Sequence, residues 1–325
     1  MTSYFLGIDI GATKSHALVA DESGRALGFG KAGPGNHEVV GYDGLVATLK
    51  EITGQALNQA GVQTKDIAGA GFGVAGYDWA SELQPTLEAI GALELTAPVK
   101  AVNDTVIGLI AQASEGWGVA VVAGTSNNCW GRDHQGREGH VTGCGSWFGE
   151  YGGAGDLVDR AFHAVVAEWS RRGQPTRLTQ AFFEYTGAHD IEDFLEGITN
   201  GRYHLEAAAA PLVFQVALAG DEVAREVIEW IGQQQGSLAV GVIRQLGFEK
   251  LEFEVVLVGS LYNGGALLID PMRQTIQSEA PLARLVRLEA PPVMGGVLLG
   301  MEQAGYHPFP VRERLAASTR ELIWD

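Results

Sequence analysis

Asp104 is the residue of this sequence best placed to act as an acid–base group. Asn103 and Asp104 follow an expected strand at residues 98–102 and precede an expected helix at 106–113. Ligands of α/β proteins bind at the carboxyl ends of strands, so this position favours a functional carboxylate, although a plain helix N-cap is the alternative. The helix dipole predicts that Asp104 stays ionised at neutral pH, orienting a substrate hydroxyl and accepting its proton late.

A second acid, Asp9, lies near the end of an expected buried strand at residues 5–10, and a second strand is expected at 15–20. Small residues connect them, which lets backbone N–H groups approach an anion: Gly11, Ala12, Thr13 and Lys14. Asp9 could hold a cation through water at the edge of this turn. An ordinary N-terminal hairpin is the alternative.

A segment similar to this hairpin occurs 112 positions later in the chain. Thr13, Asp21, Gly24 and Arg25 correspond to Thr125, Asp133, Gly136 and Arg137. The second copy has its own small turn, formed by Gly124, Thr125 and Ser126. Two related hairpins predict a duplicated domain whose turns face each other, unless the match is due to chance.

Three further segments contain candidate ligand-binding residues. Asn36 precedes an expected helix and could be a plain helix-entry residue or bind a sugar hydroxyl. Trp147 and Glu150 lie in a glycine-rich segment at residues 143–155. An indole beside a carboxylate suits a sugar ring; the alternative is that Trp147 fills a domain interface and Glu150 is a helix-entry acid. Gly259 and Ser260 end an expected strand at 253–260, again at a ligand-binding edge.

The elements that position these residues indicate two α/β domains. A chain of 325 residues is long for one hydrophobic core. Its content of 46% hydrophobic and 19% charged residues is typical of a globular protein. We expect an N-terminal domain of residues 1–114 plus 306–325, whose final helix packs back on it. Residues 115–305 form the second domain, with mostly helical residues 175–245. The run Gly71–Gly76 matches G-x-G-x-x-G, but the domain starts with a strand–turn–strand hairpin, so we discount a dinucleotide site.

Charge and composition exclude several classes of partner. A net charge of −17 argues against nucleic acid and anionic membranes. Two cysteines, Cys129 and Cys144, are too few for a disulfide framework and fit a reducing cytoplasm. No export signal or membrane-spanning segment is expected.

Taken in order, these motifs resemble the sugar kinases of the actin-like ATPase superfamily, and within it the N-acetylglucosamine kinase branch of the BadF/BadG/BcrA/BcrD-type ATPases. The resemblance covers nearly the whole chain through residues 9–14, 103–104, 123–127, 143–155 and 256–260. It implies a duplicated ribonuclease-H-like fold with ATP in an interdomain cleft, and a cytoplasmic homodimer.

The resemblance also implies a role for each candidate residue. Asp9 is similar to the acid that organises Mg²⁺, and Asp104 to the base that accepts the proton of the sugar 6-hydroxyl. The turns Gly11–Lys14 and Gly124–Ser126 look like phosphate loops, and Gly259-Ser260 like the adenosine loop. Asn36, Trp147 and Glu150 match sugar-binding positions. The sequence departs from the family where Ile10, Ala12 and Ser260 replace glycines and where Glu150 replaces an aspartate of the animal enzymes.

We therefore expect an ATP-dependent kinase of an amino sugar, N-acetylglucosamine at O6, with glucosamine, N-acetylmuramate or another hexose as alternative substrates. A P-loop kinase is excluded because no G-x-x-x-x-G-K-[ST] occurs, and no structural zinc is expected without clustered cysteines. Two alternatives of another class remain open. They are an activator of a radical dehydratase, whose iron–sulfur cluster needs thiolates, and a sugar sensor without turnover.

Overall fold

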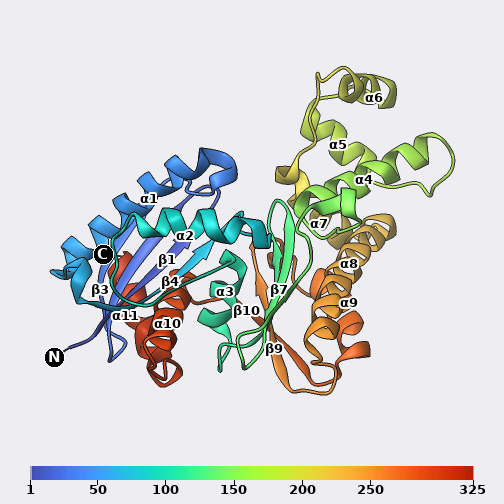
Figure 1. Ribbon diagram of the computed structural model, residues 1–325. Helices are drawn as coiled ribbons and strands as arrows, with labels where there is room; N and C mark the ends of the chain where they lie inside the picture. Colours follow the sequence, from blue (N-terminus) through green and yellow to red (C-terminus); the bar gives the residue numbers. More distant parts are fainter. Residues whose placement is uncertain (1, 325) are drawn as a thin grey trace.

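The computed structural model describes residues 2–324, which form two lobes, each built on a five-stranded mixed sheet (Figure 1). The N-terminal sheet has the order β3-β2-β1-β4-β5, and the C-terminal sheet has the order β8-β7-β6-β9-β10. The first contains β1 (Tyr4–Ile10), β2 (Ser15–Asp21), β3 (Ala26–Ala32), β4 (Ile67–Val74) and β5 (Val99–Val102). The second contains β6 (Gly118–Ala123), β7 (Asn127–Arg132), β8 (Glu138–His140), β9 (Phe253–Val258) and β10 (Ala283–Arg287).

The two sheets share one topology. In each, the first three strands are antiparallel neighbours, and the fourth and fifth strands run parallel to the first. The expected fold class, α/β with duplicated ribonuclease-H-like domains, is confirmed. The proposed repeat is therefore a repeat of structure as well as of sequence.

The turns that follow β2 and β7 share the same backbone hydrogen bonds. Asp21 Oδ1 accepts from the backbone N–H of Ser23 and Arg25, and Asp133 Oδ1 accepts from the equivalent N–H groups of Gln135 and Arg137. Gly24 and Gly136 have φ of 79° and 76°, which only glycine adopts without strain. The D-x-x-G-R pattern thus fixes the same reverse turn in both lobes.

Helices cover both faces of the N-terminal sheet (Figure 1). The helix α1 (His37–Ala60) packs on β2 and β3, and α2 (Leu83–Gly91) packs on α1 and β5. Against β1 and β4 lies α10 (Val293–Gln303), which approaches so closely that a Cβ at Gly7 would meet Val293 O at 2.5 Å. The terminal helix α11 (Arg312–Trp324) contacts β3, as expected for the tail. The predicted domain boundaries remain a prediction, and α10 from the second segment packs on the first sheet.

One helix, α3 (Asp104–Gln112), lies between the lobes. It packs on α10 and also on β6, β7 and β9. Val106, Ile107 and Ile110 join the core shared with α10, whereas Leu109 packs with Ala120 and Val256 of the C-terminal sheet. Residue 104 therefore starts a helix that both lobes hold.

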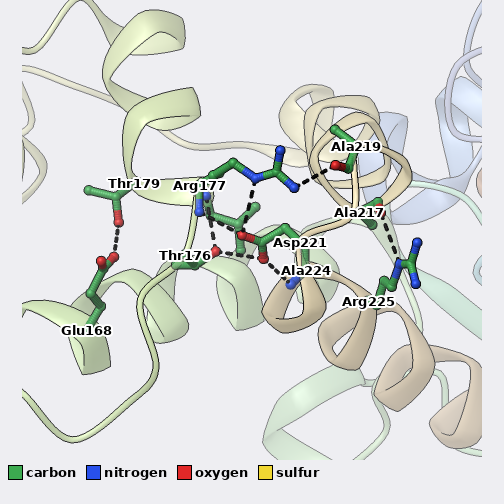
Figure 2. A network of polar contacts seen from close by, with 10 residues as sticks. Glu168, Thr176, Arg177, Thr179, Ala217, Ala219, Asp221, Ala224 and Arg225 are labelled. Atoms are coloured by element: carbon green, nitrogen blue, oxygen red, sulfur yellow. Dashed lines mark hydrogen bonds and ion pairs between the residues drawn. The ribbon is translucent and has the colours of Figure 1, made fainter.

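The C-terminal sheet is covered by α8 (Glu222–Leu246) and α9 (Ala266–Glu279), while α4 (Ala154–Trp169), α5 (Leu178–Thr186), α6 (Ile191–Thr199) and α7 (Ala210–Leu218) extend away from it (Figure 1). A buried carboxylate organises this helical part. Asp221, the N-cap of α8, accepts from Ala224 N, Thr176 Oγ1 and Arg177 N (Figure 2). These bonds fasten the chain before α5 to the start of α8.

Some elements differ from the sequence-based expectation. The strands β3, β8 and β10 and the helix α9 were not predicted, because each is short, polar or broken by glycine or proline. The glycine run at 71–76 is not a dinucleotide loop, as expected. Gly71 and Gly73 lie within β4, where a Cβ would meet Gly296 O at 2.3 Å and Ile107 Cδ1 at 2.3 Å. Across the described residues, every helix is too short or too polar to cross a membrane.

Candidate active site

The acidic candidates of the N-terminal lobe lie at one edge of its sheet. Parallel pairing places Asp9 of β1 opposite Gly73 of β4, and Gly73 opposite Val102 of β5. Neighbouring strands are about 4.8 Å apart, so the ends of β1 and β5 are separated by about 10 Å. Asp104 follows β5 directly, and the two predicted carboxylates therefore face the same region of the molecule.

Asp104 is the first residue of α3, and the N-cap is Asn103, whose Oδ1 accepts from Thr105 N at 2.9 Å. The alternative of a simple N-cap role for Asp104 is therefore wrong. The expectation that Asp104 stays ionised at neutral pH is also wrong. Burial, together with the charges of Asp9 and Asp78, raises the pKa of Asp104 to about 7, although backbone N–H groups lower it. This carboxylate can accept a proton near neutral pH.

A third acid, Asp78, adjoins this pair. It follows β4, and its Oδ1 accepts from Asn103 Nδ2 at 2.9 Å. Burial and the charges of Glu38 and Glu82 raise the pKa of Asp78 to about 6, while His140 and the Asn128 amide of the other lobe lower it. Asp78 thus lies where the N-terminal lobe meets β7 and β8.

The first predicted phosphate loop is exposed beside Asp9. The backbone O of Gly11 accepts from Gly35 N at 3.0 Å and from Asn36 N at 3.3 Å, which fixes the start of the loop. The side chains of Ala12, Thr13 and Lys14 are exposed. Asp9 Oδ2 lies 3.8 Å from His16 Nδ1 on the neighbouring strand. The loop therefore has a fixed base and an accessible tip.

The second predicted loop, Gly124–Ser126, is packed between two other segments. Gly124 O accepts from Ala154 N at 2.9 Å and Thr125 O from Gly155 N at 3.1 Å, so α4 begins against the loop. On its other side lies Gly259, with φ of 115°, where a Cβ would meet Ala123 O at 2.3 Å. The structure therefore joins Gly124, Thr125, Ser126, Gly259 and the start of α4 into one site. No hydrogen bond between described residues links the two loops, which belong to different lobes.

A cavity of about 540 Å³ adjoins this second loop. Ser260 and Ala154 line it, so the predicted adenosine loop opens directly into it. The remaining wall is mostly apolar and comes from the chain around α7 and from the 3₁₀ helix Ser260–Gly264: Ala207, Ala208, Ala210, Pro211, Phe214, Gln215, Leu261, Asn263 and Gly264. An apolar cavity with a few polar groups suits a flat heterocycle.

The predicted sugar-binding residues have different environments. Asn36 is the N-cap of α1, with its Oδ1 accepting from Glu38 N, and only 7% of its surface is exposed. The plain helix-entry role is therefore confirmed, and it leaves a sugar contact untested. Both oxygens of Glu150 accept from Thr142. Trp147 is 91% exposed and lines a separate cavity with Tyr151, Trp230 and residues of α4.

Sequence reasoning missed Asp78 and the apolar wall of the cavity. Asp78 follows the glycine run at 71–76, where attention to a nucleotide motif obscured the acid at the end of the strand. The wall residues 207–215 are distant in sequence from Ser260, and no motif marks them. An acid after the fourth strand was the available signal for Asp78.

The residues present fit a magnesium ion that is held partly by phosphates. Mg²⁺ keeps several waters and needs only one or two protein carboxylates when a nucleotide supplies other ligands. Asp9 meets this need, with a side chain 18% exposed beside the first loop. Among residues 2–324, no group of three or more His, Cys, Asp or Glu side chains could form an all-protein cage.

Comparison with known proteins places this geometry in context. The model of the BadF/BadG/BcrA/BcrD ATPase family matches residues 6–300. A solved structure from Chromobacterium violaceum, provisionally described as an N-acetylglucosamine kinase, superposes with a TM-score of 0.62 at 22% identity. The match covers 91% of this chain and 98% of that one, and it shows that the fold is the same.

Two curated relatives are similar over nearly their full length. The N-acetylmuramic acid/N-acetylglucosamine kinase of Clostridium acetobutylicum is 22% identical over 302 residues, covering 92% of this chain and 99% of the relative. The N-acetyl-D-glucosamine kinase of Dictyostelium discoideum is 25% identical over 313 residues, covering 91% and 97%.

Proposed function

This chain belongs to the BadF/BadG/BcrA/BcrD ATPase family, and we propose that it is an ATP-dependent kinase that phosphorylates the 6-hydroxyl of N-acetylglucosamine. The observation that supports a kinase best is a carboxylate with a pKa of about 7, Asp104, at the edge of one sheet, opposite a lobe with a nucleotide-sized cavity. Both curated relatives are named as kinases that act on N-acetylglucosamine.

In this proposal the nucleotide binds mainly to the C-terminal lobe. The adenine occupies the apolar cavity beside Phe214 and Ser260, and the phosphates pass along the backbone of Gly124–Ser126. The exposed loop Gly11–Lys14 contacts the β- and γ-phosphates from the other lobe. Backbone N–H groups and Lys14 then offset the negative charge of the chain around the triphosphate.

The acceptor sugar binds near Asp104 on the N-terminal side. Asp104 accepts the proton of the 6-hydroxyl as the oxygen attacks the γ-phosphorus, while the bond from that phosphorus to the bridging oxygen breaks and ADP leaves. The pKa of Asp104 matches that role at neutral pH. Asn36, Trp147 and Glu150 are proposed to bind the other sugar groups, with Trp147 moving from its exposed position when the lobes close. Lobe closure would exclude water from the transfer.

Asp9 is proposed to hold Mg²⁺ through water beside the first loop. The ion, when bound, neutralises charge on the β- and γ-phosphates. Asp9 itself would orient the water shell of the ion. We also propose, from the family resemblance, that the protein is a cytoplasmic homodimer, which light scattering would test.

An iron–sulfur activator is disfavoured by the cysteines. Burial raises the pKa of Cys129 well above its usual value, so this residue stays a thiol, and Cys144 alone is exposed. Cluster ligation requires thiolates. A colourless, oxygen-stable preparation is expected, and a brown, oxygen-sensitive one would favour the activator.

Sugar-dependent release of ADP tests the proposal and identifies the acceptor. The panel contains N-acetylglucosamine, glucosamine, N-acetylmuramate and glucose, each assayed with ATP and Mg²⁺. We expect the highest kcat/KM for N-acetylglucosamine, and 6-phosphorylation is checked by NMR of the product. Faster turnover of another sugar would change the substrate, whereas binding without any ADP release would indicate a sensor.

A further inference from the structure

The side chain of Asn103 joins two loops at the edge of the N-terminal sheet. Its Nδ2 donates to Tyr77 O at 3.2 Å and to Asp78 Oδ1 at 2.9 Å, and its Oδ1 accepts from Thr105 N at 2.9 Å. Only 1% of Asn103 is exposed. Both amide hydrogens are therefore used by the loop after β4, while the oxygen is used by α3.

The loop after β4, which accepts both hydrogen bonds of the Asn103 amide, is itself fixed. The backbone N–H groups of Asp78 and Trp79 both donate to Glu82 Oε2 at 2.8 Å. Glu82 in turn lies 3.8 Å from His37 of α1. The backbone at Asp78 is thus held by its own loop, and this loop presents the carboxylate to Asn103.

Asp104 follows Asn103 directly, so the orientation of the Asn103 amide sets the first turn of α3. We propose that Asp78 is a positioning residue for Asp104 and acts through the Asn103 amide; this inference rests on the proposed function. A charged acceptor makes a stronger hydrogen bond than a neutral one, and Asp78 supplies it to a buried donor. Loss of that bond would let the amide turn and shift Asp104 relative to the acceptor hydroxyl.

The competing role for Asp78 is direct binding of a sugar hydroxyl. It lies near Asp104 and, on the other lobe, near Asn128 and His140. If Asp78 bound the sugar, it would act through its charge, and its removal would raise KM for the sugar. If Asp78 positions Asp104, it acts through its hydrogen bond to Asn103, and its removal would lower kcat.

Four variants separate these roles, with steady-state kinetics measured at saturating ATP. Asp78→Ala removes the acceptor, and we expect kcat to fall by about 10- to 100-fold with the sugar KM changed less than about 3-fold. Asp78→Asn keeps an acceptor oxygen for Asn103 Nδ2, so the loss should be smaller, about 5-fold. Asn103→Asp sets two carboxylates against each other and should be as damaging as Asp78→Ala.

The double variant Asp78→Asn/Asn103→Asp restores a donor–acceptor pair with the roles reversed. We expect it to recover about 3-fold or more of the kcat lost in Asn103→Asp, because the new amide donates to the new carboxylate, while the bond to Tyr77 O stays lost in both variants. No recovery would overturn the proposal. A rise in the sugar KM of about 10-fold in Asp78→Asn with unchanged kcat would also overturn it, in favour of a sugar ligand.

A measurement without turnover keeps the inference separate from the proposed function. Hydrogen exchange of the peptide that contains Thr105 and Val106 should be at least about 10-fold faster in Asp78→Ala than in wild type. The control Asp43→Asn, an exposed acid of α1, should leave it unchanged. Unchanged exchange in Asp78→Ala would overturn the positioning role, whereas a wild-type protein inactive on every sugar would contradict only the kinase.

Discussion

Asp104 is subject to two opposed influences on its proton affinity. The end of a helix favours the carboxylate by about 0.3–1 kcal/mol, less than one pKa unit. Burial and the charges of Asp9 and Asp78 act in the other direction and raise its pKa from 3.8 to about 7. Burial and like charge therefore outweigh the helix dipole, and the raised pKa suits the proposed role of Asp104 as a base near neutral pH.

The first prediction concerns the side chain of Asp104. Asp104→Asn keeps the shape but cannot accept a proton, so kcat should fall by about 100-fold or more while the sugar still binds. Coupled ADP release gives kcat, and calorimetric titration with the sugar gives the affinity. A variant with near-normal kcat would contradict the role of base.

The second prediction concerns pH. Asp104 must be ionised to accept a proton, so kcat/KM should fall as pH decreases below about 7 and level off above it. Asp78→Asn removes one of the charges that raise this pKa, which should move the inflection to lower pH. An inflection that stays in place in this variant would assign the limb to another group, such as the nucleotide.

At the scale of elements, the proposed nucleotide site depends on close contact between segments distant in sequence. The turn after β6, Gly124–Ser126, is contacted by the start of α4 and by Gly259, the residue after β9. Each contact is made by backbone, so side-chain chemistry alone does not define the site. Glycine is needed at positions 153 and 259, because a Cβ there would meet Thr125 O at 2.7 Å and Ala123 O at 2.3 Å.

The third prediction tests this contact with a matched pair of glycines. Gly259→Ala should raise KM for ATP by about 10-fold or more, because its Cβ would meet Ala123 O at 2.3 Å and displace the loop. Gly265→Ala is the control. Gly265 also has a positive φ, 65°, but no atom lies within 4 Å of the position that its Cβ would take. Only a conformational cost of about 1 kcal/mol is therefore expected. Equal effects of the two variants on KM would show that contact with the loop is unimportant.

At the scale of the whole molecule, α3 and α10 make the two lobes one unit. Arg132 of β7 donates to Glu302 of α10 at 2.6 Å, and these side chains are 14% and 21% exposed. Arg312 of α11 donates to the last carbonyl groups of α3, Ala111 O and Gln112 O. The proposed lobe closure would therefore occur around elements that remain joined.

The fourth prediction concerns this joint. Glu302→Ala removes the carboxylate partner of Arg132, which keeps only its bond to Gly116 O, and should lower the free energy of unfolding by about 1–3 kcal/mol. The control is Glu252→Ala, whose partner Arg284 lies 3.6 Å away in a pair that is 60% and 68% exposed. That variant should change stability by less than about 0.5 kcal/mol. Urea unfolding measures both free energies. Equal losses would show that the ion pair between Arg132 and Glu302 stabilises the protein no more than an exposed pair does.

The local features of this protein follow from its amino-acid sequence alone. Strand–turn–strand hairpins, the repeated D-x-x-G-R turn and the acid after β5 depend on neighbouring residues, so the duplicated fold and the position of Asp104 at a strand end could be predicted. The proton affinity of Asp104, the bond between Asp78 and Asn103, and the cavity beside Ser260 came from tertiary packing. These depend on burial and on distances between residues far apart in the chain, and no local pattern encodes such distances.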